Sequence, residues 1–97
     1  MAEREYRIGQ EHKMEYVKMI NNHMQFHDLK KFKLLARGKS MNTAIDVALI
    51  LKGFGEKQNI GFLKFKEPIT KIFSQEVNKE DKHFIISCIE IQMEMGE

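Results

Sequence analysis

The chain has 97 residues, of which 42% are hydrophobic and 31% are charged. This length supports one hydrophobic core, so we expect a single domain over residues 1–97 and no separate substrate lobe. The composition is typical of a folded globular protein and excludes the disordered and fibrous classes. The formal net charge of +2 at pH 7 is only mildly basic, so the placement of the charges is more informative than their sum.

The one cysteine of the sequence, Cys88, cannot form a disulfide within the chain, which favours a reducing compartment. The start of the chain is charged and has no apolar run, so it does not have the pattern of a signal peptide. No stretch reaches the roughly 18 apolar residues that are needed to cross a bilayer. We therefore expect an intracellular protein, cytoplasmic and/or nuclear, with no membrane association.

Hydrophobic periodicity predicts the first three elements of the chain. Residues 5–9 form a short, edge-like strand. Over residues 10–27 the apolar side chains recur every three or four positions, which is the period of an amphipathic helix. Residues 30–38 alternate between two faces, which is the period of a strand.

A second helix is predicted after a basic turn. Ser40 is suited to its N-cap, because the hydroxyl can accept a hydrogen bond from a backbone N–H two or three residues later. Residues 44–51 are apolar except for Asp46, so this helix must be covered on more than one side. Gly53 and Gly55 are predicted to end it.

Two long strands are predicted in the last third of the chain. Residues 61–73 form one of them, interrupted by Pro68, which cannot donate a ladder hydrogen bond. Residues 83–95 form the other, and its alternation points five side chains inward: Ile85, Ser87, Ile89, Ile91 and Met93. The polar residues 74–82 contain no signal for a two-residue hairpin turn, so we expect a long, mobile loop between the strands.

The order of these elements is β-α-β-α-β-β. This order predicts an α+β protein built as a two-layer sandwich, with two helices on one face of a mixed four-stranded sheet.

The Gly-Lys-Ser turn between a strand and a helix is compatible at first sight with a nucleotide-phosphate loop. Such a loop requires a glycine at the position of Lys33, and no acidic motif follows an apolar strand to hold Mg²⁺. Gly53, Gly55 and Gly61 lack the dinucleotide-binding spacing as well. We therefore predict no enzyme activity, no catalytic residues, no cofactor and no small-molecule substrate.

Two other candidate sites are weak. His23 and His27 are four residues apart and share a helix face, but a third metal ligand is not evident, so we predict no metal site. Cys88 has no activating neighbour in the pattern, so we interpret it as a packed or idle thiol.

The distribution of basic residues is the main functional signal. Arg37 and Lys39 lie on the strand-to-helix turn, where the helix N-terminus and Ser40 add backbone donors and a positive dipole end. Gly38 allows the backbone to approach an anion closely. The lysines in question lie near the first helix start or around the long loop: Lys13, Lys18, Lys71, Lys79 and Lys82. Together these residues predict a surface that binds nucleic-acid backbone.

Three motifs resemble those of the Alba proteins. The segment "ARGKSMNTAIDVALIL" (36–51) is similar to the family pattern K-A-x-G-[RK]-[AS]-[IM]-x-x-A-[IV]-[DE], which runs through the same turn. The segment "MEYV" (14–17) is similar to the M-N-Y-V-type element of the first helix, and "SCIEIQM" (87–93) to the S-T-I-E-I strand. The motifs occur in the family's order and cover nearly the whole chain.

The resemblance implies a β-α-β-α-β-β domain with a long β-hairpin that binds DNA or RNA. It implies a homodimer, or a heterodimer with an Alba-like paralogue, with Ile45, Leu49 and Lys52 of the second helix at the interface. Alba-like proteins include archaeal chromatin components, eukaryotic RNA-binding and translation-associated proteins, and ribonuclease P subunits. An alternative function is therefore a structural subunit of a ribonucleoprotein that acts mainly by pairing with a paralogue.

The chain departs from the archaeal pattern just before the first helix. Archaeal members carry a lysine pair there, whereas this chain has Gln10 and Glu11, and the Glu11 carboxylate repels phosphate. We therefore expect weaker duplex binding than that of a chromatin packager, and a preference for RNA or modest binding to both. No aromatic stacking platform is evident on the proposed face, so we expect contacts mainly to phosphate and sugar.

Overall fold

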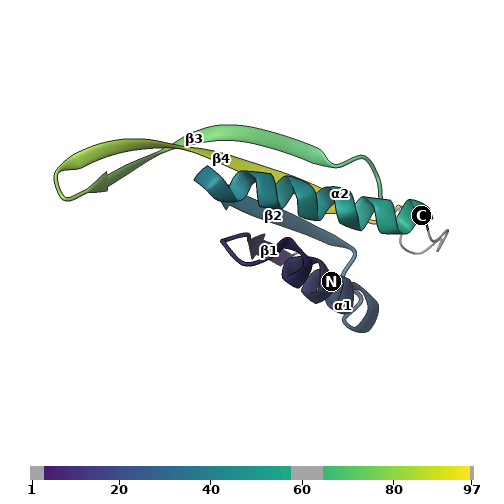
Figure 1. The fold of residues 1–97 in the computed structure, drawn as a ribbon. Coiled ribbons are helices and arrows are strands. Elements are labelled where there is room, and N and C mark those ends of the chain that lie inside the picture. Colours follow the sequence, from purple (N-terminus) through teal and green to yellow (C-terminus); the bar gives the residue numbers. More distant parts are fainter. Residues whose placement is uncertain (1–3, 58–64, 97) are drawn as a thin grey trace.

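The computed structural model describes residues 4–57 and 65–96 (Figure 1). The elements follow the predicted order: β1 (Arg4–Arg7), α1 (Lys13–Phe26), β2 (Lys31–Arg37), the 3₁₀ turn η1 (Gly38–Ser40), α2 (Met41–Lys57), β3 (Ile69–Lys79) and β4 (Lys82–Glu94). None of the helices in these residues is long and apolar enough to cross a membrane.

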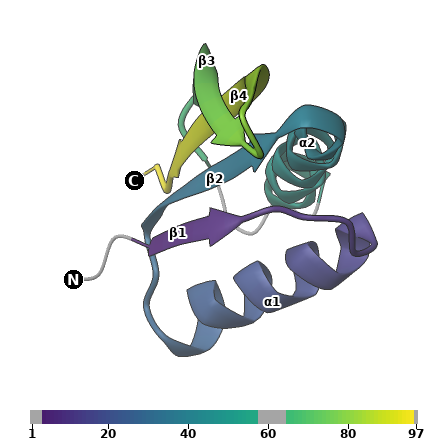
Figure 2. The same cartoon turned by 90° about the vertical axis from the view of Figure 1, so that its left-hand side faces the viewer.

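In the part of the chain that the structure describes, four strands form one mixed sheet in the spatial order β1-β2-β4-β3. β1 pairs with β2 in parallel, and the other two pairings are antiparallel. Figure 2 shows α1 below β1 and α2 beside β2, on the same face of the twisted sheet. The predicted α+β two-layer sandwich is confirmed.

The core lies between this face of the sheet and the helices. On β2, Phe32, Leu34 and Ala36 are buried and stand opposite three buried residues of β4: Met93, Ile91 and Ile89. The helices contribute further buried side chains: Val17 and Ile20 from α1, and Ala44, Val47, Ala48 and Leu51 from α2. Each large apolar side chain buried in this way contributes about 1.5–3 kcal/mol, so the alternating strands and the two amphipathic helices stabilise one another.

Beyond this core, β3 and β4 continue as a two-stranded ribbon. β4 pairs with β2 only from Cys88 to Glu94, so residues 82–87 are paired with β3 alone. We call residues 74–87 the arm; it projects past the helices in Figure 1 and lengthens the molecule to 51 Å. Ile85 and Ser87 lie on the helix side of β4 but are exposed, so the prediction that they point into the core is wrong.

The expected long, mobile loop over residues 74–82 is also wrong. β3 runs to Lys79 and β4 begins at Lys82, so Glu80 and Asp81 alone form the turn. Their φ angles are 53° and 62°, and two consecutive positive φ angles define the hairpin turn that matches the twist of the strands. Neither residue is Gly or Asn, so the usual sequence signal of this turn is missing.

The second helix differs from its prediction at both ends. At its start, the 3₁₀ turn η1 (Gly38–Ser40) precedes α2, so the chain turns helically from Gly38 onward, two residues before Ser40, and Arg37 occupies the cap position of η1. At its end, α2 continues through Gly53 and Gly55 to Lys57. Glycine stops a helix when it takes a left-handed φ, and Gly53 does not take one.

The third strand begins later than predicted. Residues 61–64 of that prediction lie outside the described residues. Phe65 forms an isolated bridge with Met95, and β3 begins at Ile69, directly after Pro68. The proline therefore precedes the strand instead of interrupting it, which agrees with its lack of a ladder donor.

A polar cluster joins β1 to α1. The Tyr6 hydroxyl lies 2.6 Å from Nδ1 of His23, within hydrogen-bonding distance, and the Arg4 guanidinium lies 2.9 Å from the same nitrogen. Desolvation lowers the pKa of His23, and the nearby Arg4 and His27 lower it further. Desolvation raises the pKa of Tyr6. Among the described residues, no group of three His, Cys, Asp or Glu side chains could hold a metal ion.

The lowered pKa of His23 predicts a pH-dependent stability. Neutral His23 is favoured in the folded chain, so its contribution is present above its ordinary pKa of 6.5 and is lost as the pH falls below it. We expect the free energy of unfolding, measured with urea, to fall between pH 7 and pH 5. The fall should be smaller in His23→Gln, which keeps an acceptor for Tyr6. Equal pH dependence of the two proteins would contradict the assignment.

Candidate nucleic-acid interface

The strand-to-helix turn, residues 37–40, presents two exposed cations. β2 ends at Arg37, and Gly38 turns the chain into η1 with a φ of 57°. Arg37 and Lys39 are both exposed, and the Arg37 side chain makes no capping hydrogen bond. The first turn of α2 contains no acidic residue, so the positive end of the helix dipole adds to these two charges.

The segment before α1 lies at the same end of the domain as this turn. β1 and β2 are parallel, so the chain leaves both strands at one edge of the sheet (Figure 2). Lys13 Nζ lies 3.6 Å from Asp46 Oδ2 of α2, and both side chains are nearly half exposed. Such an exposed pair contributes little stability, so Lys13 can exchange its carboxylate for a phosphate. Glu11 is exposed in the same segment.

Lys18 is exposed on α1 but does not share a face with Lys13. Five residues of α-helix correspond to a rotation of about 140° around the axis, so the two lysines point in different directions. The structure therefore brings Lys13 toward the strand-to-helix turn and leaves Lys18 apart from it.

The predicted loop lysines lie on strands. Lys71 of β3 stands opposite Glu90 of β4, and Lys71 Nζ lies 3.9 Å from Glu90 Oε2. Lys79 and Lys82 are exposed register partners that flank the turn at the tip of the arm. Lys82 stands six residues before Cys88, which is the register partner of Arg37. At about 3.4 Å per strand residue, the tip of the arm therefore lies about 20 Å along β4 from the row of Arg37. The tip of the arm also carries the exposed carboxylates of Glu80 and Asp81, so its two lysines are offset by two negative charges. The basic turn and the lysines of the tip are thus two separate areas, and the turn is the more cationic one.

A hollow of about 500 Å³ opens beside the strand-to-helix turn. Its lining includes Arg7, Leu35, Arg37, Phe73, Gln75 and Cys88. Because Leu34 and Ala36 face the helices, Leu35 and Arg37 lie on the opposite, open face of the sheet. We call this feature the open-face hollow.

Sequence reasoning did not identify Arg7 or Phe73 as candidates. Arg7 stands opposite Leu35 through the parallel pairing of β1 with β2, and Phe73 stands opposite Cys88. Both placements depend on pairings between distant segments, which no local pattern specifies. Phe73 is 48% exposed, so an aromatic ring is present on this face, contrary to the prediction that none is available.

The outer side of α2 carries exposed apolar residues. Ile45 is 39% exposed and Leu49 is 62% exposed, one helical turn further on. Ile72 and Ile85 are 72% and 69% exposed and lie on the helix side of β3 and β4, because they share the parity of buried Ile89. We call these four residues the α2–arm surface.

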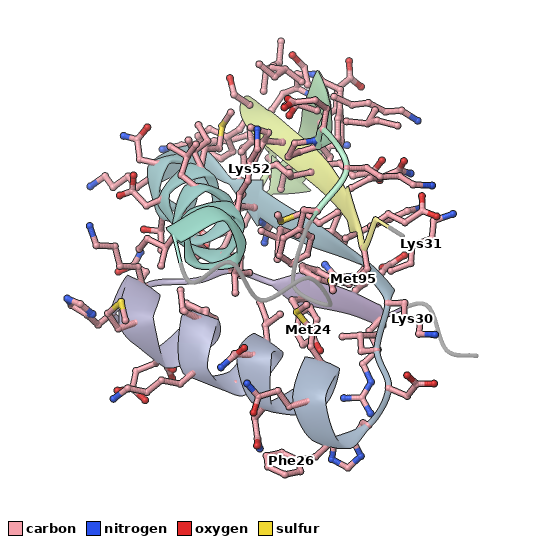
Figure 3. The ribbon with its side chains drawn as sticks, turned by 90° about the vertical axis from the view of Figure 1, so that its right-hand side faces the viewer. Met24, Phe26, Lys30, Lys31, Lys52 and Met95 are labelled. Carbon is pink, nitrogen blue, oxygen red and sulfur yellow. The ribbon has the colours of Figure 1, made fainter. Side chains whose placement is uncertain are left out.

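The third residue predicted for the pairing interface, Lys52, is already engaged within the chain. Lys52 Nζ lies 2.6 Å from Glu67 Oε1, which ties α2 to the segment before β3. Figure 3 shows Lys52 on α2 near β3.

The fold has a solved counterpart. It matches Alba from Thermoplasma volcanium with a TM-score of 0.74 and 22% sequence identity, over 93% of this chain and 98% of that chain. No protein-family model matches the chain, and the search of curated proteins finds no match. The chain therefore has an Alba-like fold, as the sequence motifs indicated.

The backbone of the strand-to-helix turn generates a stability prediction with an internal control. An added methyl group at Gly38 meets no atom within 4 Å, so only the φ of 57° opposes a side chain there. We expect Gly38→Ala to lower the free energy of unfolding by about 1 kcal/mol, because a left-handed φ strains an L-residue.

Gly53→Ala is the matched control. Gly53 lies within α2, has an ordinary φ and has equally open space, so alanine should raise the free energy of unfolding by about 1 kcal/mol. Urea denaturation measures both values. Destabilisation by Gly53→Ala would contradict the continuation of α2 through this glycine.

Proposed function

We propose that this chain is a non-catalytic nucleic-acid-binding protein that contacts the backbone of RNA and/or DNA. The observation that carries the proposal is the strand-to-helix turn, where exposed Arg37 and Lys39 flank Gly38 at a helix N-terminus without a nearby acid in the first turn. Backbone N–H groups, the helix dipole and two cations all favour a phosphate at one place. The Alba-like fold and the three sequence motifs support the same function.

The geometry of the basic turn and the tip lysines suggests how a strand would be bound. The tip lysines lie about 20 Å from the row of Arg37, and the nucleotides of a helically stacked strand rise by about 3.4 Å each along the axis. A stacked strand of roughly six nucleotides therefore reaches from the turn to the tip of the arm, and an extended single strand needs fewer. The exposed ion pairs of Lys13 and Lys71 are weak enough to be exchanged for phosphate contacts along this path.

The preference for RNA or for modest binding to both nucleic acids rests on Glu11. This exposed carboxylate lies at the same end of the domain as the strand-to-helix turn. It opposes the approach of a stiff duplex with its high charge density, whereas a flexible single strand can avoid it.

We propose further that the chain pairs with a second copy or with an Alba-like paralogue through the α2–arm surface. Leu49, Ile72 and Ile85 are each more than 60% exposed, and burial of such side chains stabilises an assembly. The arm is a two-stranded ribbon, which is marginally stable in water unless another surface covers it. In a two-fold dimer the same surface on each chain covers the other.

The α2–arm surface also supports a second candidate function. In this alternative the chain is a ribonucleoprotein subunit that acts mainly by pairing with a paralogue. Light scattering after size exclusion separates the two. A homodimer that shifts RNA by itself supports the binding protein, whereas a monomeric or aggregating chain without RNA affinity supports the structural subunit.

The strand-to-helix turn predicts a loss of RNA affinity when its two cations are removed. Arg37→Ala/Lys39→Ala should lower the affinity for a short RNA at least about tenfold at low salt, because two charge-assisted phosphate contacts are lost. The slope of log affinity against log salt should fall by roughly 1.4 to 1.8. Fluorescence anisotropy at several salt concentrations measures both quantities. The melting temperature should not change, because both side chains are exposed.

Lys30→Ala/Lys31→Ala is the matched control for charge. It removes the same two positive charges at the opposite end of β2, where Figure 3 shows both lysines. It should change RNA affinity much less than the turn variant. If both double variants weaken binding equally, the affinity depends on net charge alone and the turn is not the binding site.

The α2–arm surface predicts that a charge within it breaks the pairing of two chains. Leu49→Asp should convert the dimer to a monomer in light scattering, because a carboxylate in an apolar interface is left unpaired. Phe26→Asp is the control, since Phe26 is 74% exposed but lies at the far end of α1 (Figure 3). A wild-type chain that is monomeric at micromolar concentration would contradict self-pairing.

A further inference from the structure

We propose that the open-face hollow holds one unpaired nucleotide, with its base stacked on Phe73 and its phosphate held by Arg7 and Arg37. This inference rests on the nucleic-acid-binding function proposed above and specifies its substrate, a strand with unpaired nucleotides in place of a continuous duplex.

The sheet register builds the hollow from a row of unequal side chains. Arg37, Cys88 and Phe73 stand side by side on β2, β4 and β3. Cys88 is the small middle member and is only 4% exposed, whereas its two neighbours are a long cation and a large ring. Cys88 therefore forms the bottom of the hollow, and the longer side chains of Arg37 and Phe73 form its two sides. Arg7 of β1 lies on the same face and stands opposite Leu35, which is two residues before Arg37 on β2.

Phe73 has the properties of a stacking platform. Its ring is 48% exposed and has no aromatic partner among the residues that the structure describes. An exposed aromatic ring on an open sheet face is a common way for proteins to stack an unpaired base. Gln75 lies two residues further along the same face, with its Oε1 atom 3.7 Å from the Cys88 thiol. Its amide N–H₂ group can donate to the edge of the base.

The charge of the hollow selects an anionic ligand. Arg7 and Arg37 line it, and no acidic side chain does. Within residues 4–57 and 65–96, neither arginine forms an ion pair. Two guanidinium groups beside an exposed ring therefore match a phosphate attached to a flat aromatic base. A volume of about 500 Å³ is in the usual range for a small-ligand site.

A duplex does not supply such a base, because its bases are paired and stacked inside the helix. Arg37 belongs both to the hollow and to the strand-to-helix turn, so one strand can contact both without a gap. The hollow thus adds its own preference for single-stranded or bulged nucleic acid to the one that Glu11 gives the backbone contact.

The test compares single-stranded RNA, carrying one 2-aminopurine, with a matched RNA duplex. Phe73→Ala should lower the single-strand affinity about tenfold, the effect expected for the loss of one stacked base, and change duplex affinity less than twofold. It should also abolish the change of 2-aminopurine fluorescence on binding. Phe73→Trp should retain both the affinity and a fluorescence change on binding, because an aromatic face remains. Arg7→Ala should likewise weaken single-strand binding more than duplex binding.

Phe26→Ala is the matched control, because this exposed phenylalanine lies far from the hollow, at the end of α1 (Figure 3). It should leave both affinities and the fluorescence change on binding unaltered. Circular dichroism of each variant verifies the fold, and Phe73→Trp provides a second reading if Phe73→Ala does not fold.

The results separate this inference from the function on which it rests. If Phe73→Ala and Arg7→Ala change neither affinity, or change both equally, while Arg37→Ala/Lys39→Ala still weakens binding, the nucleotide site is wrong and the backbone contact stands. A wild-type chain that binds the duplex as tightly as the single strand would also overturn the site. If the turn variant has no effect either, the proposed function fails as well.

Discussion

Phe32, Leu34 and Ala36 bury one face of β2 against the alternate residues of β4, and this packing fixes the register of the sheet. Because side chains alternate strictly along a strand, the same register decides what lies on the opposite face. A slip of one residue would turn Arg37 into the core and Leu34 into solvent. The apolar core therefore determines which cations, which thiol and which aromatic ring share the open face.

The candidate binding features lie where core packing ends. The strand-to-helix turn follows Arg37, the last residue of β2 that pairs with β4. On the far side of its partner Cys88, residues 82–87 of β4 pair with β3 alone. Polar and charged side chains are tolerated there because they remain exposed to solvent. The arm carries lysines at its tip, and its exposed apolar residues are part of the surface through which we propose pairing. Stability thus comes from the sandwich, and the proposed contacts with other molecules come from its edges.

The alternation of β3 separates two proposed interactions. Ile72 lies on the helix side with the α2–arm surface, whereas Phe73 lies on the open side with the hollow. Pairing with a second chain and stacking of a nucleotide therefore use opposite faces of one strand and do not compete for the same side chains. Arg37 joins the hollow to the strand-to-helix turn, so the proposed nucleic-acid contacts form one continuous path on the side that the proposed pairing leaves open.

The sequence by itself determined the order of the elements, the buried faces of β2 and β4, and the basic turn at Gly38, because these are local patterns of period and residue type. It did not indicate the turn at Glu80 and Asp81, since neither residue carries the usual signal. It also misplaced the end of α2, because helix packing outweighs the low propensity of Gly53. Only the tertiary structure placed Arg7 and Phe73 beside Arg37, since pairing between distant strands depends on the register that the assembled core selects.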